Sequence, residues 1–199
     1  EATMFRQLVA LVCCLFLNVQ AMAAVTQFPY EAEVRADNAT VRCGQGKNYY
    51  VTMQLRQGTH VVVHRHDPGG WAMISPPDGS FSWIAADQVR MDGAGIGVVE
   101  LPEGDTAGAP VWVGSDQGAE HSVRQRILRS GDAVQILGEE SLGGRKYLKI
   151  APPTREFRWI KMDFLLPSDP ELRQTALNDP FANPLESEPK TAAIEEEPD

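Results

Sequence analysis

Short alternations of apolar and polar residues run along the middle of the chain and predict β-strands. The stretch 60–65 reads HVVVHR, so alternate valines share one face of an extended segment, and 133–137 repeats the alternation. A turn signal, DPGG at 67–70, precedes a strand that opens with Trp71. No convincing helical periodicity interrupts 28–166. The pattern is typical of an all-β protein.

Four stretches of the first half recur in the second half in the same order. The pairs are Leu55–Gly58 with Leu128–Gly131, Trp71–Ile74 with Tyr147–Ile150, Ser75–Pro77 with Ala151–Pro153, and Phe81–Ile84 with Phe157–Ile160. The first pair is displaced by 73 residues and the other three by 76, which indicates a three-residue insertion in a loop at 139–145. The chain therefore holds two copies of a unit of about 65 residues.

Repeated strand–turn–strand units of this size predict two small antiparallel barrels in tandem, since closure removes exposed sheet edges. We expect the first barrel at 28–92, a linker at 93–97 and the second barrel at 98–167. Domains this short bury a small share of their surface, so we expect Trp83 and Trp159 to fill much of each core.

The two ends of the chain predict export and disorder. Arg6 and a ten-residue apolar run at 8–17 precede the small residues of 21–23, so we expect a signal peptide at 4–23, with an uncleaved anchor as the alternative. The segment 168–199 is rich in Pro and Glu, with nine acids against two bases, and we expect a disordered tail that solubilises the protein or docks a partner.

Charge and cysteine content narrow the function. The net charge is −9, most of it in the predicted tail, so a basic nucleic-acid footprint is absent. We also expect no membrane insertion after signal cleavage. Without the predicted signal peptide, Cys43 is the only cysteine, which excludes an internal disulfide and a cysteine-based zinc site. A buried single thiol is the interpretation of Cys43.

An ordered set of motifs in the first repeat resembles the bacterial SH3-like domain (SH3b). The motifs are Thr40–Gly46, Leu55–Gly58, Val61–Val63, Trp71 and Ser82–Ile84. The resemblance covers 28–90 well and 97–166 less well, because Val111–Asp116 lacks the arginine of the first copy. It implies barrels of exported proteins that bind cell-wall peptides or partner proteins.

Aromatic residues close to turns supply a candidate ligand-binding surface. Tyr49 and Tyr50 follow the turn at 44–47, Trp71 follows another turn, and Arg42 precedes the first. Rings with one polar edge suit extended peptides or sugars. If the two tyrosines lie in a strand, one of them must point inward, so at most one would contact a ligand. Packing alone is the alternative for all four residues.

No set of residues with a catalytic pattern is apparent. Cys43 lacks the context of an activated thiolate, and no strained serine elbow is present. His60, His64 and His66 lie on one side of the predicted strand. They could bind a common metal ion only if the strand bends. We interpret them instead as a polar strip that faces outward. We therefore expect no enzyme, no cofactor and no metal site.

These observations favour an exported, non-enzymatic binding module located in the periplasm, cell envelope or extracellular space. Its expected partner is a cell-wall peptide or glycan, or an envelope protein. A protein–protein scaffold subunit of an envelope complex is the alternative, and a hydrolase is a weaker one.

Overall fold

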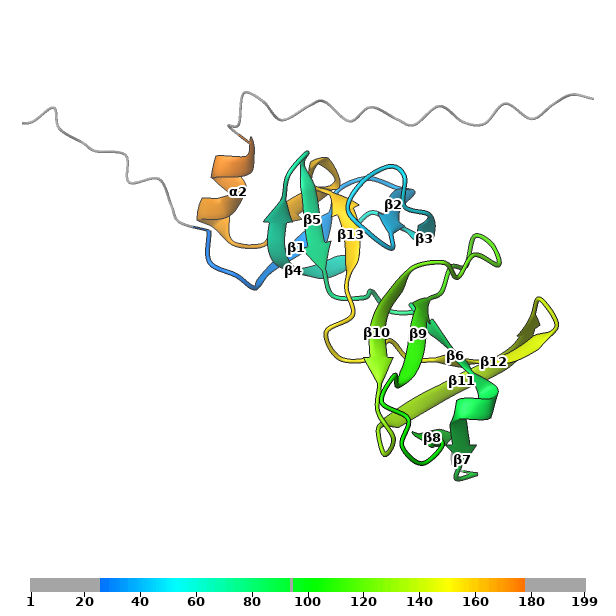
Figure 1. Ribbon diagram of the computed structural model, residues 1–199. Helices are drawn as coiled ribbons and strands as arrows, with labels where there is room; N and C mark the ends of the chain where they lie inside the picture. Colours follow the sequence, from blue (N-terminus) through cyan, green and yellow to red (C-terminus); the bar gives the residue numbers. More distant parts are fainter. Residues whose placement is uncertain (1–25, 94, 178–199) are drawn as a thin grey trace, which may run out of the picture.

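The computed structural model describes residues 26–93 and 95–177, which form two antiparallel β-sheets and one short α-helix (Figure 1). The all-β fold class is thus confirmed. The predicted signal peptide at 4–23 and the predicted tail from 178 onward lie outside the described residues. Within the described ranges, no helix has the length and apolar character needed to cross a membrane.

Each sheet contains seven strands. The first sheet comprises, in order of pairing, β14 (Leu165–Pro167), β1 (Tyr30–Val34), β4 (His60–Asp67), β5 (Trp71–Ile74), β13 (Arg158–Lys161), β2 (Ala39–Arg42) and β3 (Val51–Leu55). The second comprises β10 (Arg124–Leu128), β9 (Ala109–Val113), β6 (Ser82–Ala85), β12 (Arg145–Ile150), β11 (Ala133–Leu142), β8 (Ile96–Val99) and β7 (Val89–Met91). Two 3-10 helices, η1 (Ala86–Gln88) and η2 (Met162–Phe164), precede β7 and β14. We call the first sheet with its helix the first lobe, and the second sheet the second lobe.

The two repeats exchange their last two strands. β6 and β7 of the first repeat lie in the second sheet, and β13 and β14 of the second repeat lie in the first sheet (Figure 1). When each strand is replaced by its equivalent in the other repeat, the order of the first sheet becomes the order of the second. Each sheet therefore combines strands of both 28–92 and 98–167, which corrects the expectation that each range closes its own barrel.

The exchange preserves the pairing register. Arg158 of β13 lies opposite Ile74 of β5, and Ser82 of β6 lies opposite Ile150 of β12. Both pairs occupy equivalent positions of the repeats, 76 residues apart. An exchanged strand thus occupies the place that the corresponding strand of its own repeat would otherwise fill.

Two linkers, 75–81 and 151–157, carry the chain from one lobe to the other. Each begins with a residue followed by two prolines, which lack N–H groups and favour extended backbone in the residue before them. A single turn follows, with Ser80 N–H donating to the Pro77 carbonyl at 3.0 Å and Glu156 N–H donating to the Pro153 carbonyl at 3.1 Å. Short, stiff linkers of this kind favour exchange over return to the same sheet.

Side chains on β13 that have no counterpart on β6 form contacts that favour β13 in the first sheet. Trp159 Nε1 on β13 donates to Asp67 Oδ2 at 2.7 Å, and Lys161 Nζ lies 4.9 Å from the ring centroid of Trp71. Ala85 stands on β6 at the position equivalent to Lys161 and has no charged group to place over Trp71. These contacts favour β13 over β6 in the first sheet.

A buried ion pair at the end of the second linker is hydrogen-bonded to the end of the first linker. Arg158 Nη1 lies 2.7 Å from Glu156 Oε1, and both side chains are fully buried. Ser82 Oγ donates to the same carboxylate oxygen at 2.5 Å, and Arg158 Nη2 donates to the Phe81 carbonyl at 3.2 Å. Among the described residues, Glu156 Oε2 and Arg158 Nε have no hydrogen-bond partner. The pair therefore depends on a small number of contacts from the other repeat.

The hydrophobic core of each lobe is shared between the repeats. The first core includes Ile160 and Leu165 from the second repeat, and the second core includes Ile84 and Val89 from the first repeat. Neither repeat therefore buries a complete apolar core within its own range. Trp83 is buried, as predicted, but in a smaller cluster with Phe81 and Leu142, whereas Trp159 is half-buried.

The predicted tail begins with an ordered helix, which corrects the expectation of disorder from 168 onward. Helix α2 spans Pro170–Leu177 and contacts β14. Asp169 Oδ1 accepts hydrogen bonds from the N–H groups of Glu171 and Leu172 at 2.9 and 3.1 Å, and Pro170 occupies the first helical position. A capping residue followed by proline was the available sequence signal for this helix.

Two predicted loops are shorter than expected. β8 begins within the predicted linker 93–97, and it pairs with β7 and β11. The insertion expected in a loop at 139–145 instead lengthens a hairpin, because β11 continues to Leu142 and the turn lies at Gly143 and Gly144, both with positive φ. The inserted residues extend β11 and β12 and form additional pairs between these two strands.

Two of the three strand histidines pack against aromatic rings instead of forming an outward polar strip. His64 Nε2 lies 2.7 Å from Ser75 Oγ, and its ring contacts Phe157 at a centroid distance of 5.1 Å. His66 Nε2 lies 2.6 Å from the Tyr30 hydroxyl. A register shift between Val63 and Arg65 separates the two histidine environments. His60 remains exposed.

Removal of the Glu156 carboxylate is expected to destabilise the whole fold. Glu156→Ala leaves the Arg158 guanidinium buried without its counter-charge, which should lower the free energy of unfolding by about 3–5 kcal/mol. Arg145→Ala is the matched control, since it removes an exposed ion pair with Asp87 that contributes little. Urea denaturation of both variants measures the difference, and equal stabilities would contradict the structural importance of the crossing.

A candidate binding cleft between the lobes

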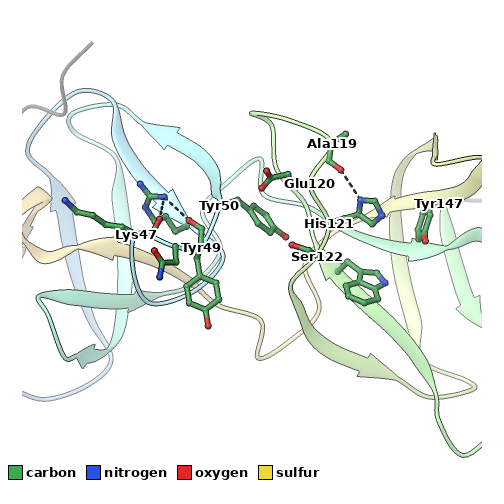
Figure 2. A pocket seen from close by; sticks show the side chains of 11 residues that line it. Lys47, Tyr49, Tyr50, Ala119, Glu120, His121, Ser122 and Tyr147 are labelled. Atoms are coloured by element: carbon green, nitrogen blue, oxygen red, sulfur yellow. Dashed lines mark hydrogen bonds between the residues drawn. The ribbon is translucent and has the colours of Figure 1, made fainter. Parts of the chain in front are cut away.

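Equivalent connections of the two repeats face each other across a cleft of about 900 Å³ that is largely open to solvent (Figure 2). One connection runs from β2 to β3 and the other from β9 to β10. The cleft is lined by Arg42, Lys47, Asn48, Tyr49, Tyr50, Trp112, Ala119, Glu120, His121, Ser122 and Tyr147. Five of these eleven residues carry rings, and each lobe supplies some of them.

The first-lobe wall is a loop held by Arg42. Arg42 Nη1 donates to the Tyr49 carbonyl at 2.8 Å and to the Lys47 carbonyl at 3.4 Å. The Tyr49 ring packs directly on Gly44, where an added Cβ would lie 2.4 Å from the ring. Glycine at this position therefore allows the close approach that places the Tyr49 ring, which remains 40% exposed.

The second-lobe wall consists of three ring side chains from separate elements. His121 Nδ1 lies 2.9 Å from the Ala119 carbonyl and acts as the donor, and its ring contacts Tyr147 at a centroid distance of 5.4 Å. Trp112 extends from β9, with the Arg124 guanidinium 6.0 Å from its ring centroid. Figure 2 shows His121 and Tyr147 on this side, across the cleft from Tyr49.

Equivalent β-bulges lie where the lobes meet. In the first sheet, the pairing register between β2 and β3 shifts at Arg42 and leaves Thr52 of β3 unpaired. In the second sheet, the register between β9 and β10 shifts in the same way and leaves Gln125 of β10 unpaired. Bulges commonly redirect a side chain. Gln125 Nε2 reaches across to the Cys43 carbonyl at 2.9 Å. It thereby joins the second lobe to the first.

Further hydrogen bonds hold the cleft walls at a fixed separation. The Tyr50 hydroxyl donates to the Val113 carbonyl at 2.6 Å, and Ser115 Oγ donates to the Val51 carbonyl at 2.8 Å. Burial, together with the neighbouring Cys43, raises the pKa of the Tyr50 hydroxyl well above its usual value. The hydroxyl is therefore protonated, and able to donate, throughout the physiological pH range.

The structure brings together three of the four predicted binding residues. Arg42, Tyr49 and Tyr50 line the cleft, whereas Trp71 is not among its lining residues and is 6% exposed. Tyr50 directs its hydroxyl to the other lobe, and Tyr49 presents its ring to the cleft. Trp71 is covered because Lys161 lies opposite it on the exchanged strand.

Sequence reasoning missed the entire second wall. Tyr147 is the repeat equivalent of Trp71, but it lies opposite the small Ala85 and so lines the cleft. Trp112 is the equivalent of Arg42, since the two pair with the equivalent residues Trp83 and Trp159. The repeat alignment could have indicated both residues.

His121 had no sequence signal, because it lies in a connection that differs between the repeats.

Cys43 is buried, as predicted, and burial raises the pKa of its thiol to about 11. A thiol with such a pKa is protonated near neutral pH and is a weak nucleophile.

Comparisons with known proteins return no relative: no family model, no curated protein and no solved structure matches the chain. Function is therefore inferred from the geometry and chemistry of the cleft.

Loss of the Tyr50 hydroxyl is expected to weaken the contact between the lobes. Tyr50→Phe removes one hydrogen bond to a buried carbonyl and should lower the free energy of unfolding by about 1 kcal/mol. Tyr49→Phe, at a 40% exposed ring, serves as the control and should change it little. Urea denaturation compares the two variants, and an unchanged stability of Tyr50→Phe would show that the bond does not hold the walls.

Proposed function

We propose that this chain is an exported, non-enzymatic binding module of the cell envelope that holds a cell-wall peptide or glycan in the cleft between its lobes. The observation that carries the proposal is the cleft itself. Its volume of about 900 Å³ lies within the range of about 300–1,000 Å³ that is common for ligand sites.

The lining of the cleft supports binding of an extended, amphipathic ligand. Three of the four tyrosines of the chain line it, although aromatic residues make up only 8% of the sequence. Tyrosine and tryptophan offer large apolar faces with a polar edge and few rotatable bonds. Such side chains bind sugar rings and extended peptides with a small loss of side-chain entropy.

The rigidity of the cleft supports the same proposal. Hydrogen bonds from Tyr50, Ser115 and Gln125 hold the two walls together in the absence of any ligand. A site that is already formed loses little freedom on binding, which improves affinity for a given set of contacts.

The location in the envelope rests on the sequence. The predicted signal peptide at 4–23 supports export, and the motifs that resemble the bacterial SH3-like domain support a role in binding at the cell wall. Both repeats are proposed to be SH3-like units, the second one divergent, joined by strand exchange into one binding unit.

A pull-down on purified cell-wall sacculi tests the proposal. The chain 24–199 should bind, and Tyr49→Ala and His121→Ala, from opposite walls, should each weaken binding by about three- to tenfold. Leu137→Ala is the control, since it removes a 49% exposed apolar side chain outside the cleft and should bind normally. Circular dichroism establishes that each variant is folded.

Absence of binding by the intact chain would contradict the proposal. Equal binding by the intact chain and by Tyr49→Ala and His121→Ala would show that the protein binds the cell wall through a surface other than the cleft. Stoichiometric copurification with an envelope protein, in material free of cell wall, would instead support the role of a protein–protein scaffold.

A further inference from the structure

We infer that the cleft is selective for an anionic glycan, whose carboxylate lies on the first-lobe wall while a sugar ring stacks on the second-lobe wall. The inference rests on the proposed function and specifies its ligand. It is carried by the charge of the lining and by the different chemistry of the two walls.

The cleft has the opposite charge balance to the protein. Its lining contains Arg42 and Lys47 against one acid, Glu120, whereas the whole chain carries a net charge of −9. A positively charged cleft on a negatively charged protein attracts anions locally, while the remaining surface repels them. An anionic ligand is therefore bound at this site in preference to the rest of the molecule.

Both cations among the lining residues belong to the first-lobe wall, whereas on the second wall the Arg124 guanidinium lies behind the lining, 6.0 Å from the Trp112 ring centroid. Arg42 and Lys47 belong to the first lobe, and the Arg42 guanidinium already holds the loop through the Tyr49 carbonyl. The exposed ammonium group of Lys47 is thus the principal charge available to a ligand carboxylate. Glu120 lies across the cleft and disfavours the same carboxylate on the second wall.

Equivalent positions of the repeats have diverged into different chemistry. Arg42 pairs with Trp159 in the first lobe, and Trp112 occupies the same position opposite Trp83 in the second lobe. One wall thus presents a guanidinium where the other presents an indole. A ligand that satisfies both walls is itself asymmetric, with an anionic group at one end and a ring face at the other.

A glycan fits the second wall better than a peptide does. Trp112, His121 and Tyr147 line this wall, with the His121 and Tyr147 rings in contact, and the apolar faces of sugar rings pack on aromatic faces. The uncharged polar lining residues Asn48, on the first wall, and Ser122, on the second, have short side chains suited to hydroxyl groups. The cleft offers no exposed β-strand edge among its lining residues, since β3 begins after Tyr50.

Peptide-free glycan strands, released from sacculi by an amidase, provide the test ligand. In these strands every second sugar carries a free lactyl carboxylate. The matched control is the same material after carbodiimide coupling with ammonia, which converts each carboxylate to a neutral amide and leaves the sugars intact. Binding of both to the chain 24–199 is measured by isothermal titration calorimetry at low and high salt.

The native strands should bind at least tenfold more tightly than the amidated strands, and the difference should shrink as salt rises. Lys47→Ala should remove most of this discrimination, whereas Lys146→Ala, at an exposed lysine outside the cleft, should retain it. Glu120→Gln should strengthen binding of the native strands alone, because it removes a like charge.

The failure of this inference differs from the failure of the proposed function. If intact sacculi are bound but the native and amidated strands are bound equally or not at all, anionic glycan selectivity is overturned while envelope binding stands. If released stem peptides bind in place of the strands, the ligand is a peptide. If neither sacculi nor strands bind, the proposed function fails together with the inference.

Discussion

The crossing of two proline-containing linkers, 75–81 and 151–157, determines how the rest of the molecule is built. Each linker carries the last strands of its repeat into the other sheet, so each hydrophobic core is completed by residues from the opposite half of the sequence. The buried Glu156–Arg158 pair lies at this crossing and receives contacts from Ser82 and Phe81 of the other repeat. Two repeats that could form separate domains therefore form one unit.

The position of the cleft is a consequence of the exchange. Because the lobes are tied together at the crossing, equivalent connections of the two repeats face each other across a short gap. Bulges at equivalent positions, Thr52 and Gln125, lie at this junction, and the Gln125 side chain crosses it. A duplicated structural unit thereby produces one shared site whose walls have been free to diverge, as Arg42 and Trp112 illustrate.

Local sequence patterns predicted the strands and turns but not the partners of those strands. Alternation at 60–65 and the turn signal at 67–70 report on neighbouring residues, so β4 and the β4–β5 turn were found. The exchange depends on which equivalent strand fits a sheet better, and the repeats resemble each other too closely for patterns to decide. The choice rests on side-chain pairs such as Lys161 with Trp71, which become visible only in three dimensions.

The same limit explains which site residues were found. Arg42 ends β2, and Tyr49 and Tyr50 lie in the connection that follows it, so the proximity of the three residues follows from the sequence. Trp71 and Tyr147 are equivalent in sequence, but their exposure depends on the residue opposite each one, Lys161 or Ala85, which belongs to an exchanged strand. The repeat alignment could indicate Tyr147 and Trp112 as counterparts of Trp71 and Arg42, but the exposure of Tyr147 to the cleft follows only from the exchange.

Engineered cysteine pairs test the strand exchange most directly. Ala72 lies opposite Ile160 in the structure, whereas Ile84, the fully buried repeat equivalent of Ile160, lies opposite Leu148. Neighbouring antiparallel strands place such partners within disulfide range. In a Cys43→Ser background of the chain 24–199, which then has no other cysteine, mass spectrometry of unreduced digests should find an intramolecular disulfide in the A72C/I160C protein and none in the A72C/I84C protein. A disulfide in A72C/I84C alone would show that each repeat closes its own sheet and would contradict the shared cleft.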